Sequence, residues 1–93
     1  MRVTTWAEYG LIVSLHLAKD GSDAPTPARD LAEREGLPAD YVEQILLKLR
    51  RAGLVRSVRG AKGGYFLARD PNTVSVKDVM EAAVPGILIS MEA

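Results

Sequence analysis

The sequence predicts a small, mainly α-helical domain with one β-hairpin, arranged as a winged helix-turn-helix. Three observations support this fold class: two helical segments meet at a glycine turn, two short β-rich runs follow, and the bases of the chain are concentrated in the same stretch. Ninety-three residues, 47% hydrophobic and 26% charged, have the size and composition of one globular domain. We expect that domain to span residues 1–83.

A first helix is predicted from about Trp6 to Lys19, where apolar residues recur at helical spacing. Thr5 precedes it, and Glu8 follows Thr5 by three residues, which is the spacing of a capping box. The chain has one histidine, His16, and its place on this helix is explained by packing without a metal.

A pair of helices joined by a tight turn is predicted next. Thr26 and Pro27 are typical of a helix cap and a first helical residue. This short helix should end at Glu35, because Gly36 is a natural left-handed stop. A second helix is expected over residues 39–52. Its apolar residues have the spacing of a buried stripe: Val42, Ile45, Leu46 and Leu49.

The pattern then changes to that of a β-hairpin. Residues 54–59 and 65–68 are short and β-rich, and the glycine-rich stretch 60–64 separates them. We therefore predict a wing over residues 54–69.

The last predicted element is a helix over residues 76–83. Ser75 can cap it, and we expect Val79 and Met80 to face inward. Residues 84–93 form an apolar tail, which we interpret as the start of a missing or shortened dimerisation or sensor segment.

The formal net charge of zero conceals a strongly uneven distribution. Residues 1–44 carry a net charge of −4 and residues 70–93 carry −3, whereas residues 45–69 carry +7 and contain no acid. A basic block of this kind attracts a polyanion, although it can also be a merely solvated surface. Here it covers the end of the second helix of the pair and the whole wing, so charge and fold indicate the same function.

That function is sequence-specific binding of double-stranded DNA. Helix 39–52 would enter the major groove, and the wing would lie against the backbone or the minor groove. Tyr41, Glu43 and Gln44 are the candidates for base contacts, although exposed residues of these types are often only solvated. The candidates for contacts to the backbone or minor groove are Lys48, Arg50, Arg51, Ser57, Arg59, Gly60, Lys62, Gly63 and Gly64. The alternative is a winged helix that binds proteins and not DNA.

Several segments also resemble the Rrf-two (Rrf2) family of bacterial transcription regulators. The residues that carry the resemblance are Met1-Arg2-Val3-Thr4-Thr5, Tyr9-Gly10-Leu11, Ala32-Glu33-Arg34-Glu35-Gly36, Tyr41-Val42-Glu43-Gln44-Ile45-Leu46, Leu49-Arg50-Arg51-Ala52-Gly53-Leu54-Val55, and the wing motif Ser57-Val58-Arg59-Gly60-Ala61-Lys62-Gly63-Gly64-Tyr65-Phe66-Leu67-Ala68. The resemblance covers roughly residues 1–83 and implies a cytoplasmic homodimer that represses or activates promoters at palindromic DNA sites.

The resemblance also implies roles for particular residues. Tyr41, Glu43 and Gln44 would touch base edges, and Arg59 with Gly60 would enter the minor groove. Many members carry a small hydroxyl residue near position 40, where this chain has Asp40. Because an acid there would repel a phosphate, we leave it out of the contact set.

The same resemblance raises the question of an iron–sulfur cluster, which some members hold with three cysteines. This chain has no cysteine, so we expect no cofactor in it, and a cluster would require a longer, cysteine-containing form. Glu8 matches a position where some members supply an acidic ligand, but the capping box explains it without a metal.

Other function classes have little support in the sequence. An enzyme is not expected, because one histidine and no cysteine leave no recognisable catalytic arrangement. No run of 18 apolar residues is present, so we expect no membrane association.

Overall fold

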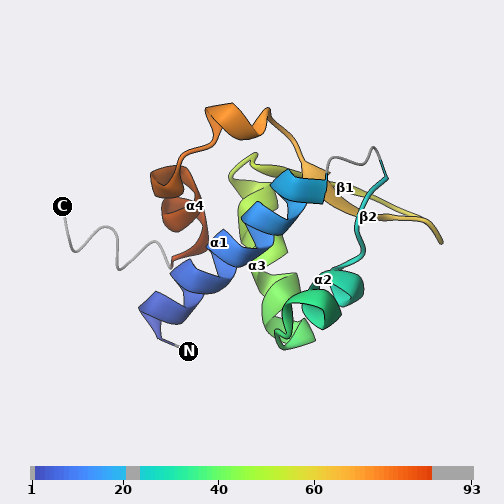
Figure 1. Ribbon diagram of the computed structural model, residues 1–93, viewed down its shortest axis with the longest axis horizontal. Helices are drawn as coiled ribbons and strands as arrows, with labels where there is room; N and C mark the ends of the chain where they lie inside the picture. The colour runs from blue at the N-terminus through green and yellow to red at the C-terminus, as the bar shows by residue number, and fades with distance from the viewer. Residues whose placement is uncertain (1, 21–23, 85–93) are drawn as a thin grey trace.

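The computed structural model describes residues 2–20 and 24–84 and has the predicted winged helix-turn-helix architecture (Figure 1). Its elements are α1 (Val3–Asp20), α2 (Ala28–Glu35), α3 (Ala39–Arg51), β1 (Val55–Val58), β2 (Gly64–Leu67), the 3-10 turn η1 (Pro71–Thr73) and α4 (Val76–Ala83). Each predicted helix and strand is present, with ends that differ by up to three residues.

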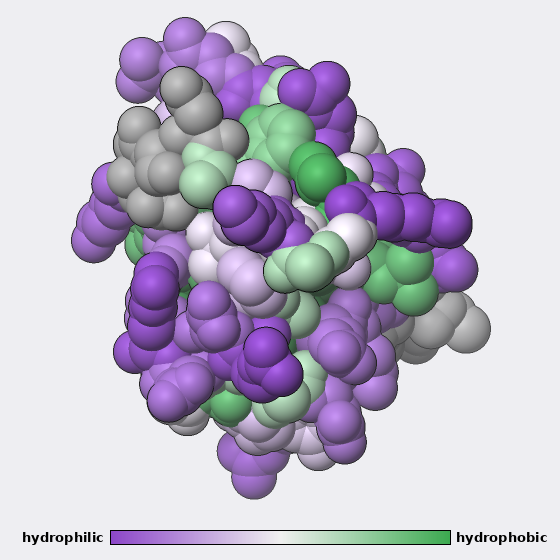
Figure 2. Space-filling model, turned by 90° about the vertical axis from the view of Figure 1, so that its right-hand side faces the viewer, coloured by the Kyte–Doolittle hydropathy of each residue, from purple (hydrophilic) through white to green (hydrophobic). Residues whose placement is uncertain are grey.

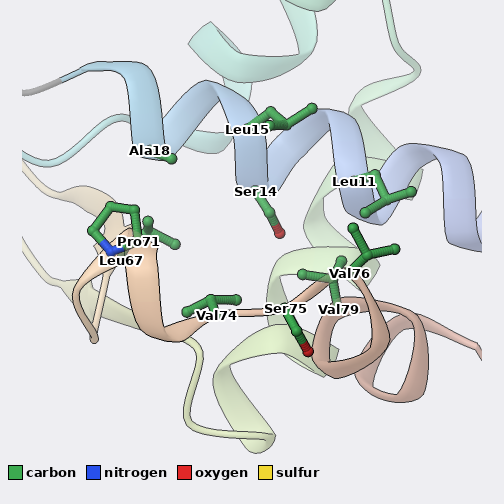
Figure 3. Close-up of a pocket in the computed structure, with 10 residues that line it drawn as sticks. All are labelled: Leu11, Ser14, Leu15, Ala18, Leu67, Pro71, Val74, Ser75, Val76 and Val79. Atoms are coloured by element: carbon green, nitrogen blue, oxygen red, sulfur yellow. The ribbon is translucent and has the colours of Figure 1, made fainter.

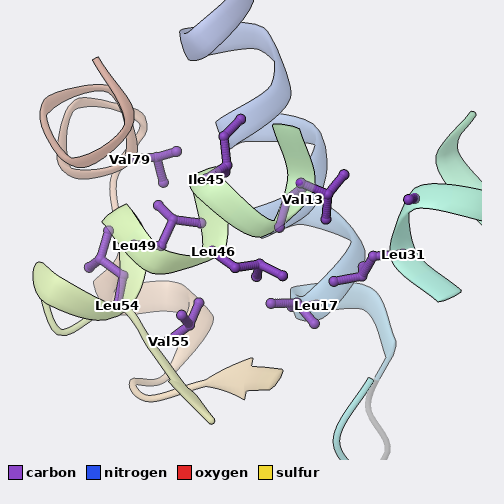
Figure 4. Close-up of a cluster of buried hydrophobic side chains, with 11 residues drawn as sticks. Val13, Leu17, Leu31, Ile45, Leu46, Leu49, Leu54, Val55 and Val79 are labelled. Carbon is purple, nitrogen blue, oxygen red and sulfur yellow. The ribbon is translucent and has the colours of Figure 1, made fainter. Parts of the chain in front are cut away.

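Helix α3 lies at the centre of the hydrophobic core. It packs against α1, α2 and α4, and a short turn over residues 52–54 connects it to β1 (Figure 4). The predicted stripe is confirmed, because its four apolar residues are fully buried: Val42, Ile45, Leu46 and Leu49. Val13 of α1 and Leu31 of α2 are fully buried beside them. Burial of one such side chain contributes about 1.5–3 kcal/mol, so these contacts fix α3 rigidly on the other helices.

The turn between α2 and α3 is closed by a glycine in the left-handed conformation. Gly36 has a φ of 66°, and the N–H of Leu37 donates to the carbonyl of Ala32 over 2.9 Å. This bonding satisfies carbonyls at the end of α2, as in a Schellman-type cap. The predicted stop at Gly36 is confirmed.

The wing is an antiparallel hairpin with an additional partner. In the register of β1 and β2, Ser57 lies opposite Tyr65 and Val58 opposite Gly64. On its other side, Tyr65 forms an isolated bridge with Thr26, with N–H to carbonyl distances of 2.9 and 2.8 Å. The segment before α2 therefore ties the wing to the helix pair.

This bridge corrects the prediction for Thr26. We expected Thr26 to cap the second helix, but the cap position of α2 is Pro27, and no side-chain hydrogen bond caps that helix. Thr26 is buried and pairs as a short strand with Tyr65. Pairing between distant segments replaces the local cap at this position.

Two expectations about other helices were also wrong. Helix α1 begins at Val3, because the carbonyl of Arg2 accepts hydrogen bonds from the N–H groups of Thr5 and Trp6. Thr5 therefore lies inside the first turn and does not form the expected capping box with Glu8. On α4, Val79 is buried as predicted, but Met80 is 42% exposed.

The cap of α4 was predicted correctly at Ser75 and is reinforced by Asp78. The Ser75 hydroxyl accepts from the N–H of Asp78, and the Asp78 carboxylate accepts from the N–H of Ser75, both over 3.0 Å. Hydrogen bonding of the Asp78 carboxylate to Ser75, chiefly to the backbone N–H and secondly to the side chain, holds the pKa of Asp78 below its ordinary value.

Val84 is the last residue that the structure describes. The rest of the predicted tail, residues 85–93, lies outside the described residues. Among the helices described, none has both the length and the apolar character needed to cross a membrane.

Candidate nucleic-acid interface

The exposed face of α3 carries the residues predicted to read bases. Glu43 and Gln44 are both exposed, opposite the buried stripe of the same helix. Leu47 and Arg51 continue this face toward the end of α3. A carboxylate, an amide and a guanidinium on one face of a helix can form hydrogen bonds with base edges or phosphates.

One flank of this face is lined by aromatic residues of α1. The Tyr41 ring is partly exposed and lies 6.3 Å from the ring of Tyr9, centroid to centroid. The ammonium of Lys48 lies 5.1 Å from the ring centroid of Trp6, within the range of a cation–π interaction. Tyr41 and Lys48 are therefore held against α1.

The other flank of the face meets the hairpin. Arg50 Nη1 donates to the hydroxyl of Ser57 on β1 over 3.3 Å. Beside this contact, a shallow groove of about 380 Å³ lies between the start of α2 and the hairpin. Its lining includes five of the predicted backbone-contact residues besides Ser57: Arg50, Arg59, Gly60, Gly63 and Gly64.

The tip of the hairpin presents two bases to solvent. Arg59 and Lys62 are both exposed. Gly60, between them, has a φ of 114°, which side-chain-bearing residues rarely adopt. A Cβ at Gly63 would collide with the carbonyl oxygen of Val58. The glycines therefore form a tight turn that keeps both basic side chains at the outermost point of the wing.

The described bases of residues 45–69 form no ion pair with an acid, although Arg69 lies close enough to Asp78 to contribute to its lowered pKa. Within the described residues, the ion pairs are His16–Glu35 and Lys77–Glu81, and neither involves residues 45–69. Figure 2 views the molecule from the side to which the hairpin points, and hydrophilic residues cover most of this face. The positive charge of the segment is therefore available to an external polyanion.

Three residues near this surface had no role in the sequence-based set. Leu47 is 36% exposed. An apolar side chain outside the buried stripe of α3 could have been recognised from the sequence as a candidate contact residue. Arg56 lies 4.9 Å from the ring centroid of Phe66, its partner across the hairpin. The sequence near Trp6 does not predict its contact with Lys48, because that contact depends on how α1 crosses α3.

The other candidate sites offer little chemistry. An apolar pocket of about 110 Å³ lies between α1 and the segment from η1 to α4, and its lining includes no charged residue (Figure 3). His16 Nδ1 lies 2.6 Å from Glu35 Oε2 and so joins α1 to the end of α2. Glu8 is exposed, and no group of three or more potential metal ligands occurs in the described parts of the chain.

Comparison with known proteins gives one family. The model of the Rrf2 family, described as iron-dependent transcriptional regulators, matches residues 3–91. The chain is 39% identical over 80 residues to the HTH-type transcriptional regulator CymR of Bacillus subtilis, covering 86% of this chain and 58% of that protein. It is 43% identical over 82 residues to the regulator IscR of Photobacterium profundum, covering 88% of this chain and 48% of IscR.

Solved structures show the same similarity. The structure of CymR, the global cysteine regulator of B. subtilis, superposes with a TM-score of 0.82 at 36% identity. That match covers 89% of this chain and 64% of the CymR chain. The chain thus spans about half the length of the curated relatives that it matches.

Proposed function

The chain belongs to the Rrf2 family of transcriptional regulators, and we propose that it binds double-stranded DNA sequence-specifically to regulate transcription in a bacterium. One observation carries the proposal: the acid-free basic segment forms the exposed end of α3 and the adjoining wing, and none of its bases is paired with an acid in the described structure. The relatives' names support regulation and not catalysis, so we propose no enzymatic activity.

In the proposed complex, α3 lies in the major groove. A helix with its side chains is about 10–12 Å wide, and the major groove of B-DNA is about 12 Å wide, so one helix fills it. Gln44 would pair with an adenine edge, and Glu43 would accept from the amino group of cytosine. Tyr41, at the edge of this face, would touch a thymine methyl or a phosphate.

The wing would bind beside the groove that α3 occupies. Arg59 and Lys62 are exposed at its tip, and Gly60 lets the backbone there approach closely. A narrow minor groove has an enhanced negative potential that attracts an inserted arginine. Arg50, Arg51, Ser57 and the remaining glycines would contact phosphates, which fix the register of the protein on the duplex.

We also propose that the protein acts as a cytoplasmic homodimer on palindromic promoter DNA. Two-fold symmetry would place the α3 helices of the two subunits in successive major grooves, about 34–36 Å apart. Light scattering of the protein bound to a palindromic duplex should give two subunits per duplex.

An iron–sulfur cluster does not fit the ligands of this chain. The family is described as iron-dependent, but the chain has no cysteine, and its described residues bring no three potential ligands together. The proposed DNA contacts require no metal, and a cluster would need a longer, cysteine-containing form of the protein.

The salt dependence of binding tests the proposal. If five to seven bases of each subunit meet phosphates, log affinity should fall with log salt at a slope of roughly −4 to −6 per subunit. Fluorescence anisotropy with a labelled duplex, selected in vitro from a random library, measures this slope. If the affinity does not depend on salt concentration, or if no duplex binds, a winged helix that binds proteins becomes the better explanation.

A further inference from the structure

Two cations of α3 lie on opposite flanks of its exposed face, and each is restrained by a neighbouring element. Residues 48 and 50 are two positions apart, which separates them by about 200° around the helix axis. Lys48 is held over Trp6 of α1, and Arg50 is hydrogen-bonded to Ser57 of β1. Between the two flanks lie the exposed Glu43 and Gln44, which are proposed to face the bases.

The restraining groups share one chemical property, which is that neither is charged. A carboxylate in either place would cancel the positive charge that a phosphate must meet. The Trp6 ring attracts the ammonium of Lys48 through its face and leaves the charge intact. The Ser57 hydroxyl accepts one hydrogen bond from Arg50, whose guanidinium has five N–H donors. Both cations are therefore positioned while their charge and most of their donors remain available.

The geometry points to Trp6 as a positioning residue for DNA binding. We propose that Trp6 holds Lys48 toward a phosphate of one DNA strand, while Ser57 holds Arg50 toward the opposite strand. This inference rests on the proposed function, because a helix that fills the major groove has a phosphate backbone along each flank. It goes further by assigning each cation to one strand and by giving α1 a part in binding.

Substitution of Lys48 and Trp6, singly and together, tests the inference. Lys48→Met should reduce the magnitude of the salt slope by about one unit, as loss of one phosphate contact requires. Trp6→Leu should weaken binding roughly two- to fivefold, the equivalent of an exposed cation–π interaction, and Trp6→Phe should retain most of the affinity. In the Lys48→Met background, Trp6→Leu should have no further effect. Lys77→Met, which removes an exposed lysine on α4, is the matched control and should leave the slope unchanged.

Tryptophan fluorescence gives a second readout that needs no change at Trp6. Trp6 is the one tryptophan of the chain, so a shift of the Lys48 ammonium toward a phosphate should change its emission when DNA binds. That change should be reduced in Lys48→Met. The strand assignment is tested with duplexes that carry one neutral methylphosphonate. Lys48→Met should become insensitive to neutral positions on one strand, and Arg50→Met to positions on the other.

Particular results would overturn the inference. If Trp6→Leu weakens binding equally with and without Lys48, Trp6 acts only through the fold. If wild type binds DNA but Lys48→Met keeps the full salt slope, the inference fails while the proposed function stands. If the wild-type protein binds no duplex, both fail together.

Discussion

Replacement of Gly64 by alanine should detach the wing from the segment before α2. A Cβ at this position would lie 2.4 Å from the Thr26 carbonyl carbon and 2.6 Å from the Pro27 nitrogen. Both atoms belong to the backbone and cannot rotate away. Ordinary contact distances begin at 3.4 Å, so the two segments would have to separate by about 1.0 Å.

The cost of this separation follows from the bridge that it disturbs. Thr26 and Tyr65 exchange hydrogen bonds of 2.9 and 2.8 Å, and an increase of about 1.0 Å takes both beyond hydrogen-bonding distance. Each such bond contributes about 0.5–1.5 kcal/mol, so the free energy of unfolding should fall by about 1–3 kcal/mol. The hairpin would also shift relative to α3, and loss of one charged contact at its tip should weaken DNA binding about tenfold.

Urea unfolding and fluorescence anisotropy measure the two effects separately, and Gly10→Ala supplies a matched control. A Cβ at Gly10 would lie 2.7 Å from the Ala83 Cβ, so the clash falls between α1 and α4, away from the wing. Overpacking of about 1–3 kcal/mol would be offset by up to about 1 kcal/mol of helix propensity. Gly10→Ala should lose stability but keep its DNA affinity. Wild-type affinity in Gly64→Ala, or an equal loss in both variants, would refute the reasoning.

Three further predictions concern other features of the molecule. Gln44→Ala should cost about 1–3 kcal/mol of binding free energy on a selected site and little on random DNA, and an equal loss on both in anisotropy titrations would show that Gln44 reads no base. Because the pKa of Asp78 is lowered in the folded protein, its ionised form stabilises α4 above the ordinary aspartate pKa of about 3.9, and this stabilisation should disappear as the pH falls through the folded value. Thermal unfolding followed by circular dichroism should show a smaller loss in acid for Asp78→Asn than for wild type. Added salt should stabilise the free protein, because it screens the unpaired bases of residues 45–69, while it weakens the DNA complex. Urea unfolding at several salt concentrations checks the first half of that prediction.

The sequence was sufficient for most features that depend on residues close together in the chain, although it placed the start of α1 three residues late and so gave Thr5 the wrong role. The buried stripe of α3 follows from apolar residues three and four positions apart, and all four proved to be fully buried. Gly36 and Ser75 end and begin helices as predicted, because a left-handed glycine and a capping hydroxyl act within one turn. The basic segment could be placed on the end of α3 and the wing for the same reason, because its residues are contiguous in the chain and the elements that carry them were predicted from local patterns.

The predictions failed where distant segments meet. Thr26 before a proline has the local pattern of a cap, but its N–H and carbonyl pair with Tyr65 of the wing. Met80 has the spacing of an inward residue, but α4 has one buried edge and Met80 lies outside it. The contact between Lys48 and Trp6 likewise depends on the crossing of two helices, which periodicity within one helix does not specify.

A surface that binds a polyanion must hold several like charges in place without neutralising them, and the basic segment of this chain has the features that such a surface needs. The acids that balance the net charge lie in residues 1–44 and 70–93, outside the basic segment. Within the segment, an indole ring, a hydroxyl and a glycine turn restrain the bases and contribute no negative charge. The cost is repulsion among the bases in the free protein, and a bound phosphate backbone removes that repulsion. A net charge of zero is therefore compatible with an uneven charge distribution, in which the basic segment forms the end of α3 and the wing.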